Sequence, residues 1–147
     1  MKWLICLFLF VSTYSYAQSG STVTKIPLKE IKRIYFKINN YRKAKGLRPL
    51  IFSEKIEKGC AEWAKYCTEK DIFVHKVTGI MTIKSSECMH KRPYSKELNE
   101  DHCPALGWYK SKPHHKIIMD YRAKYVGIAG YSDGNYDIFV LRIVNVK

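Results

Sequence analysis

The chain has 147 residues and a formal net charge of +13 at pH 7, from 26 Lys and Arg against 13 Asp and Glu. This is the length of one domain, with enough chain to bury a core without metal or cross-links. No apolar stretch approaches the roughly 20 residues that cross a bilayer, and no internal repeat is present, so we expect neither a membrane-spanning helix nor a repeat array. The cations are spread along the chain, so they indicate a solvated basic surface and no specific nucleic-acid site.

The N-terminal segment has the pattern of a secretory signal peptide over residues 1–17. Lys2 supplies the positive start, Trp3–Val11 is an unbroken apolar run, and Ser15-Tyr16-Ala17 places small residues where a signal peptidase cleaves. We therefore expect cleavage near Ala17, an N-terminal lead over residues 18–27, a folded domain over residues 28–147, and a secreted or periplasmic protein.

Two amphipathic helices are predicted in the first half of the domain. The first covers about 28–45, between Pro27 at its start and Gly46 at its end, and the second covers about 54–69 after Ser53 as N-cap. Their apolar residues recur at three- and four-residue spacing: Ile31, Ile34, Tyr35, Ile38 and Tyr41, then Ile56, Cys60, Trp63, Ala64 and Cys67. Each stripe must pack on another element.

The C-terminal part supplies that element. Residues 125–131 and 136–144 are rich in branched and aromatic residues, and the Asp-Gly between them is a hairpin signal. The last strand is apolar on both faces, so we expect helices above and below the sheet. Between the second helix and this hairpin, residues 89–103 are predicted as an irregular loop, followed by two short helices over 104–111 and 114–119.

Four cysteines remain after signal cleavage, and an exported chain with an even number suggests disulfides. Seven residues on one helix separate Cys60 from Cys67 by about 10 Å, beyond the reach of a disulfide. Pairing of Cys88 with Cys103 would close a polar loop and is the favoured prediction, with the helical pair as buried thiols. Crossed pairings remain open.

Several short motifs occur in a characteristic order. They are Asn39-x-x-Arg42-x-x-x-Gly46-Leu47-x-Pro49-Leu50, then His75, Glu87, Trp108-x-x-Ser111-x-x-His114, and a hairpin that contains Gly127. This order resembles the CAP family, the SCP-like extracellular domains that include cysteine-rich secretory proteins, antigen 5 and pathogenesis-related proteins, and it resembles the small bacterial branch best. The resemblance covers residues 28–145 and implies an α+β fold, a three-layer α-β-α sandwich with a small, mainly antiparallel sheet.

The resemblance also implies a site. His75 and His114 match the two histidines of the family cleft, and Glu87 matches its first acid. Ser111 stands where larger members carry a second acid, and Trp108 is expected to support the cleft as a core anchor. His75 and His114 are candidate ligands of a divalent metal such as Zn²⁺, since neutral imidazoles with a nearby carboxylate can form part of its shell. The alternative is that each histidine only orders the cleft.

Two functions follow from these residues. The favoured one is a binding module for an extracellular ligand, either a lipid or sterol or an anionic surface polymer attracted by the charge of the chain. The other is a metal-assisted hydrolase, peptidase-like or esterase-like, that uses His75, His114 and Glu87 as catalytic candidates. His90 and His102 fall in the expected loop and are predicted to be solvated, whereas Asn39 and Arg42 are predicted to bind loop carbonyls at the end of the first helix.

Overall fold

The computed structural model describes residues 22–76, 85–95 and 101–145, so the expected signal peptide lies outside the described residues. The helices are α1 (Leu28–Ala44), α2 (Glu54–Glu69), α3 (Pro104–Lys110) and α4 (Lys112–Ile118), and the strands are β1 (Thr24–Lys25), β2 (Ile51–Phe52), β3 (Ser85–Pro93), β4 (Ala123–Ser132) and β5 (Tyr136–Asn145). None of the helices in these ranges is long and apolar enough to cross a bilayer.

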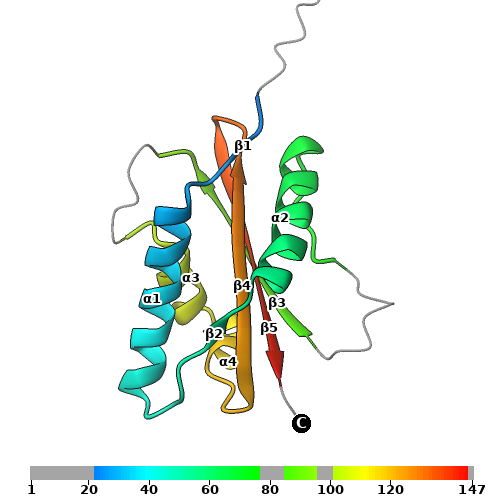
Figure 1. Ribbon diagram of the computed structural model, residues 1–147. Coiled ribbons are helices and arrows are strands. Elements are labelled where there is room, and N and C mark those ends of the chain that lie inside the picture. Colours follow the sequence, from blue (N-terminus) through cyan, green and yellow to red (C-terminus); the bar gives the residue numbers. More distant parts are fainter. Residues whose placement is uncertain (1–21, 77–84, 96–100, 146–147) are drawn as a thin grey trace, which may run out of the picture.

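A five-stranded sheet forms the middle layer (Figure 1). Its order is β1-β4-β5-β3, with β2 also paired to β4, and every pairing is antiparallel except that of β2. Helix α2 covers one face, while α1, α3 and α4 cover the other (Figure 1). This is the α-β-α sandwich expected from the sequence.

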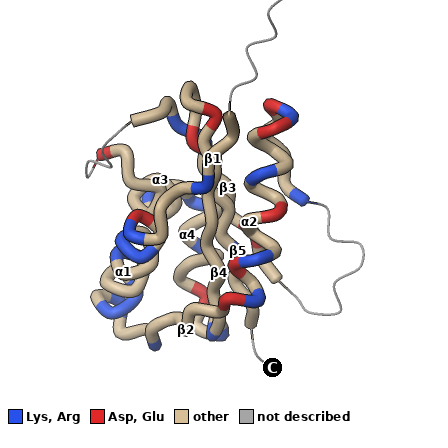
Figure 2. The backbone as a smooth tube through the Cα atoms, turned by 45° about the horizontal axis from the view of Figure 1, so that its top comes forward, with Lys and Arg blue, Asp and Glu red and all other residues tan. Residues whose placement is uncertain are grey.

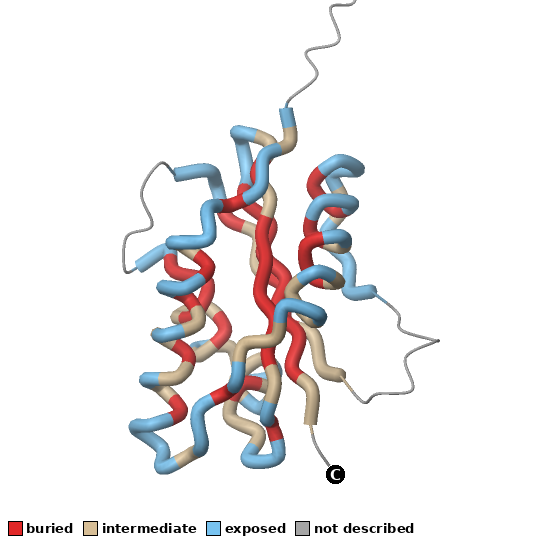
Figure 3. Tube along the Cα trace, in the orientation of Figure 1, coloured by how far each residue is buried: buried red, intermediate tan, exposed pale blue. Residues whose placement is uncertain are grey.

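Strand β5 is buried on both faces, as its apolar sequence predicts (Figure 3). Phe139, Leu141 and Ile143 belong to the core under α1, α3 and α4, whereas Ile138 and Val140 belong to the core under α2. Successive side chains of a strand point to opposite faces, so one strand supplies both cores.

Arg42 holds the end of α1 to the segment that follows α4. Its side chain is fully buried, and it donates to the carbonyls of Arg48 at 2.9 Å, Ile118 at 2.7 Å and Asp120 at 3.0 Å. Asn39 binds both backbone groups of Leu50. Both residues therefore have the structural role expected of them.

Two predictions about the fold are wrong. Residues 89–93 were expected in an irregular loop, but they belong to β3, which pairs along its whole length with β5. The polar residues of this strand do not alternate, so the sequence pattern did not predict it. The Cys88–Cys103 disulfide is not formed, since all four cysteines in the described ranges are free and buried. Cys88 and Cys103 lie in the core under α1, α3 and α4, where they pack as small apolar side chains.

Candidate functional site

The topology brings His75 and His114 together around the edge of the sheet. Strand β3 is last in the strand order of the described sheet. His75 comes from the segment that follows α2 on one face, and His114 comes from α4 on the other. Their ring centroids are 6.4 Å apart. With Glu87 and Arg142 they form the group that we call the histidine cluster.

Glu87 lies in β3 and has partners on both of its carboxylate oxygens. Oε1 is 3.1 Å from Nδ1 of His75 and accepts the backbone N–H of Lys76 at 3.0 Å. Oε2 accepts Nε of Arg142 at 2.8 Å, and Nη2 of the same guanidinium lies 2.8 Å from it. Glu87 therefore orients the His75 ring through Nδ1 and leaves Nε2 available for a ligand.

Arg142 is a site residue that the sequence reasoning missed. It occupies the middle of β5 directly opposite Glu87, and its side chain is only 3% exposed. A charge inside an otherwise apolar strand needs a buried partner, and this was the signal that could have revealed it. Arg142 therefore pairs with Glu87 inside the protein.

His114 is a neutral imidazole near physiological pH. Partial burial lowers its pKa, and the neighbouring His75 lowers it further. Because a neutral imidazole has one nitrogen with a free lone pair, His114 can accept a hydrogen bond or bind a metal ion.

His90 was expected to be solvated, and that prediction is wrong. It lies in β3, and its ring packs edge-on against Trp108 with centroids 6.3 Å apart. Gly107 makes this possible, because a Cβ there would come within 2.7 Å of the His90 ring. Burial lowers the pKa of His90 to about 4, and the charges of Arg92 and His114 act in the same direction.

Trp108, Ser111 and His115, which flank His114 in the sequence, have contacts outside the histidine cluster. Trp108 is fully buried in the core and donates its indole N–H to the carbonyl of Met89 at 3.1 Å, which confirms it as an anchor. Ser111 joins α3 to α4, where its carbonyl accepts the N–H of His115. The ring of His115 contacts Tyr109 and its carbonyl, apart from the histidine cluster.

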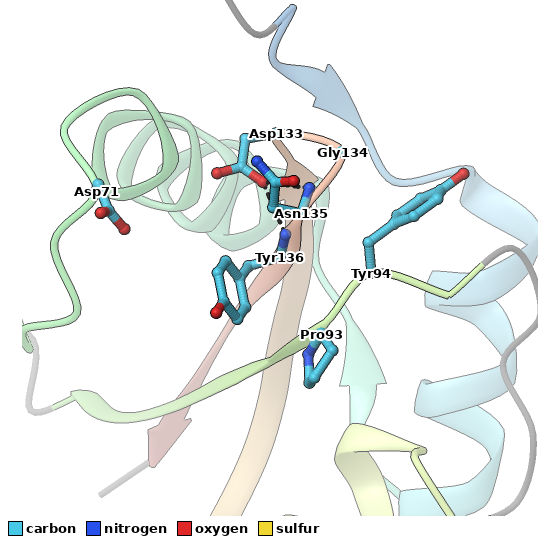
Figure 4. Close-up of a pocket in the computed structure, with 7 residues that line it drawn as sticks. All are labelled: Asp71, Pro93, Tyr94, Asp133, Gly134, Asn135 and Tyr136. Carbon is cyan, nitrogen blue, oxygen red and sulfur yellow. Dashed lines mark hydrogen bonds between the residues drawn. The ribbon is translucent and has the colours of Figure 1, made fainter.

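The largest of three cavities described by their lining residues lies elsewhere, at the tip of the β4–β5 hairpin (Figure 4). It has a volume of about 530 Å³ and is lined by Asp71, Pro93, Tyr94, Asp133, Gly134, Asn135 and Tyr136. Pro93 pairs with Tyr136 six residues along β3 from the pairing of Glu87 with Arg142, a distance of about 20 Å. None of the three cavities is lined by His75 or His114.

The histidine cluster has two imidazoles that could bind a metal ion, those of His75 and His114. A tetrahedral zinc ion binds imidazole nitrogens at about 2.0–2.1 Å, which places two ring centroids about 5 Å apart. The observed 6.4 Å requires the rings to approach by about 1 Å. In the described part of the chain no three His, Cys, Asp or Glu residues are placed to share an ion. Such an ion would take its other ligands from water or a bound molecule.

The fold defines a class of α-β-α sandwich domains. The sequence profile of the cysteine-rich secretory protein family, CAP, matches residues 35–143. The chain belongs to this family. A search of curated proteins finds no match.

Solved structures share the fold at low sequence identity. An outer surface protein from Borrelia burgdorferi superposes with a TM-score of 0.71 at 19% identity, over 86% of this chain and 100% of that chain. An extracellular protein containing a SCP domain from Bacillus anthracis superposes with a TM-score of 0.65 at 16% identity, over 82% of this chain and 42% of that chain. A cysteine-rich secretory protein from Staphylococcus aureus superposes with a TM-score of 0.59 at 16% identity, over 81% of this chain and 39% of that chain. The chain thus spans less than half the length of the Bacillus anthracis and Staphylococcus aureus proteins.

Proposed function

We propose that this protein is an extracellular binding module that captures its ligand at the histidine cluster. The observation that carries the proposal is the full engagement of Glu87 by Arg142, His75 and the Lys76 backbone. The carboxylate is held as an orienting group, and the two imidazoles are the groups left to meet a ligand.

The surroundings of the cluster favour a ligand with an apolar part. Phe73 and Val74, directly before His75, are 47% and 52% exposed. Their side chains offer apolar contact beside polar imidazoles, a combination that suits a lipid or sterol. The basic charge of the chain favours an anionic group on that ligand, and an anionic surface polymer is the second class.

Zinc binding at His75 and His114 is part of this proposal. The carboxylate behind His75 resembles the outer partner that orients metal-binding histidines elsewhere. When bound, the ion would supply a positive centre with open positions for an oxygen atom of the ligand. His75 would bind through Nε2, since Nδ1 faces Glu87.

The hydrolase alternative needs a base to activate water or a nucleophile. Glu87 was the candidate, and its contacts weaken it for that role because Oε2 already contacts Arg142 at 2.8 Å and Oε1 already contacts His75 and the N–H of Lys76. Ser111 has a helix-linking position, and among the described residues no contact between its hydroxyl and His114 supports a nucleophilic pair. We therefore favour binding over hydrolysis.

Calorimetric titration with Zn²⁺ tests the metal part of the proposal. Wild-type protein and the matched control His115→Ala should bind zinc alike, because His115 is turned toward Tyr109. The variant His75→Ala/His114→Ala should lose most of the heat of zinc binding. Equal titration of all three proteins would contradict a zinc site at this pair.

A ligand screen separates binding from hydrolysis. Thermal shifts with a panel of fatty acids, phospholipids and sterols should include ligands that stabilise the wild type and His115→Ala but not His75→Ala/His114→Ala. Ester and peptide substrates should give no turnover that depends on His114. Turnover lost in His114→Ala would favour the hydrolase instead.

A further inference from the structure

The outer face of α1 has an unusual distribution of charge. Its exposed positions fall on one side of the helix, and its buried residues, Ile31, Ile34, Ile38 and Arg42, fall on the other (Figure 3). Lys29, Lys32 and Lys43 are on the exposed side, along about 21 Å of helix. Figure 2 shows the basic residues along this helix.

The structure describes the whole of α1, and none of the exposed residues of this helix is acidic. Glu30 is the only acid in the helix, and it is partly buried. Helix α2 differs, because its exposed positions mix Lys55, Lys58 and Lys65 with acids, and Lys65 lies 3.6 Å from Glu69. The unbalanced positive charge is therefore a property of α1 that α2 does not share.

The same face exposes two large apolar side chains. Phe36 is 59% exposed and Leu28 is 60% exposed. At helical spacing Phe36 falls within the arc that holds Lys29, Lys32 and Lys43, and Leu28 falls at its margin. The ring of Tyr35, with its centroid 5.3 Å from that of Phe36, flanks the phenylalanine without covering it.

We propose that the outer face of α1, formed by Leu28, Lys29, Lys32, Phe36 and Lys43, docks onto an anionic lipid bilayer. The lysines attract the negative head groups, and Phe36 enters the boundary between head groups and acyl chains. Charge complementarity selects an anionic partner, and the exposed phenylalanine among the cations selects a bilayer over a dissolved polymer. This docking does not depend on the histidine cluster.

Co-sedimentation with vesicles tests the proposal. The purified protein should bind vesicles of phosphatidylglycerol and phosphatidylcholine in 50 mM NaCl, and should not bind phosphatidylcholine alone. Removing the three α1 charges in Lys29→Gln/Lys32→Gln/Lys43→Gln should weaken binding by about 100-fold, at about fivefold for each lysine. Phe36→Ser should weaken it by about tenfold.

Matched variants on α2 provide the controls. Lys55→Gln/Lys58→Gln/Lys65→Gln removes the same charge from the other layer, and Tyr66→Ser removes an exposed aromatic residue there. Both should bind within about threefold of the wild type, since their positions face away from the docked bilayer. His75→Ala/His114→Ala should also bind normally, which separates this proposal from the ligand site. Circular dichroism checks that each variant is folded.

A tryptophan placed at the centre of the face reports insertion. Phe36→Trp should show a blue-shifted emission with the anionic vesicles and no shift with dextran sulfate. Equal loss of vesicle binding in the α1 and α2 charge variants would overturn the proposal in favour of a diffuse charge effect. Absence of vesicle binding at 50 mM NaCl would overturn it as well, and binding of dextran sulfate without vesicle binding would assign the face to a polymer.

Discussion

The ion pair with Arg142 limits the chemical roles that Glu87 can have. From the sequence alone, a carboxylate expected to share a site with a histidine is a candidate base or metal ligand. In the structure its two oxygens are shared between Arg142, His75 and a backbone N–H. The family resemblance placed Glu87 and His75 in one site, and they are neighbours in the structure. A charge inside the apolar β5 could have marked Arg142 as needing a buried partner, but the sequence does not name Glu87 as that partner, because the two residues are 55 positions apart and only strand pairing brings them opposite each other.

His90 gives stability a dependence on pH. Its pKa is about 4 in the folded protein and near 6.5 in the unfolded chain, so between these values the unfolded chain binds the proton more strongly. The free energy of unfolding should therefore fall as the pH is lowered from 6.5 to 4, by up to about 3 kcal/mol from this residue. Below pH 4 both states are protonated and this contribution no longer changes.

Urea unfolding at several pH values measures this effect. The variant His90→Gln should show a smaller loss of stability between pH 6.5 and 4 than the wild type, while the contribution of His114, whose pKa is also lowered, remains. His115→Ala serves as the control, because its ring packs against Tyr109. Parallel pH profiles for His90→Gln and the wild type would contradict the burial argument.

At the scale of elements, the close approach of α2 to β4 depends on Gly127. A Cβ at this position would clash with the backbone of Ile56 and Glu57, in the first turn of α2. Backbone cannot move aside as a side chain can, so the helix would have to shift on the sheet. The glycine of the hairpin motif is thus explained by helix–sheet packing and not by a turn.

Gly127→Ala should lower the free energy of unfolding by about 2–3 kcal/mol, as expected for overpacking in a core. Urea denaturation followed by circular dichroism would measure it. Gly107→Ala provides a comparison, because the obstacle there is only the side chain of His90 and the cost should be smaller. A Gly127→Ala protein as stable as the wild type would show that α2 can slide without loss.

The predictions of individual elements succeeded where the sequence is periodic. Helix α2 has the predicted bounds, α1 ends within one residue of its predicted end, and the hairpin strands extend one or two residues beyond theirs. Strand β3 was missed because its residues alternate poorly. Its strand conformation comes from hydrogen bonds to β5, a tertiary interaction that no local pattern reports.

For the whole molecule, two helical layers bury all four described cysteines. Burial raises the pKa of Cys60 to about 12 and also raises the pKa values of Cys67 and Cys88. A thiol at such a pKa has almost no thiolate at neutral pH and reacts slowly.

These four thiols should resist alkylation by iodoacetamide at pH 8 in the folded protein and react fully in 6 M guanidinium chloride. Mass spectrometry of tryptic peptides, without reducing agent, would count the carbamidomethyl groups on each cysteine. The denatured, unreduced sample should show all four modified, which a Cys88–Cys103 bond would prevent. Rapid labelling without denaturant would contradict the burial of the thiols.

The sequence by itself determined the layers, because apolar periodicity reports which face of each helix is buried and the doubly apolar β5 requires cover on both sides. The family resemblance also led us to expect His75 and His114 in one site, and their rings lie 6.4 Å apart. Only the tertiary structure decided what surrounds them: the pairing of β3 with β5 places Glu87 against Arg142, and it packs the half-buried His90 against Trp108. The physical reason is that burial and ion pairing depend on residues distant in the chain, whereas periodicity is local.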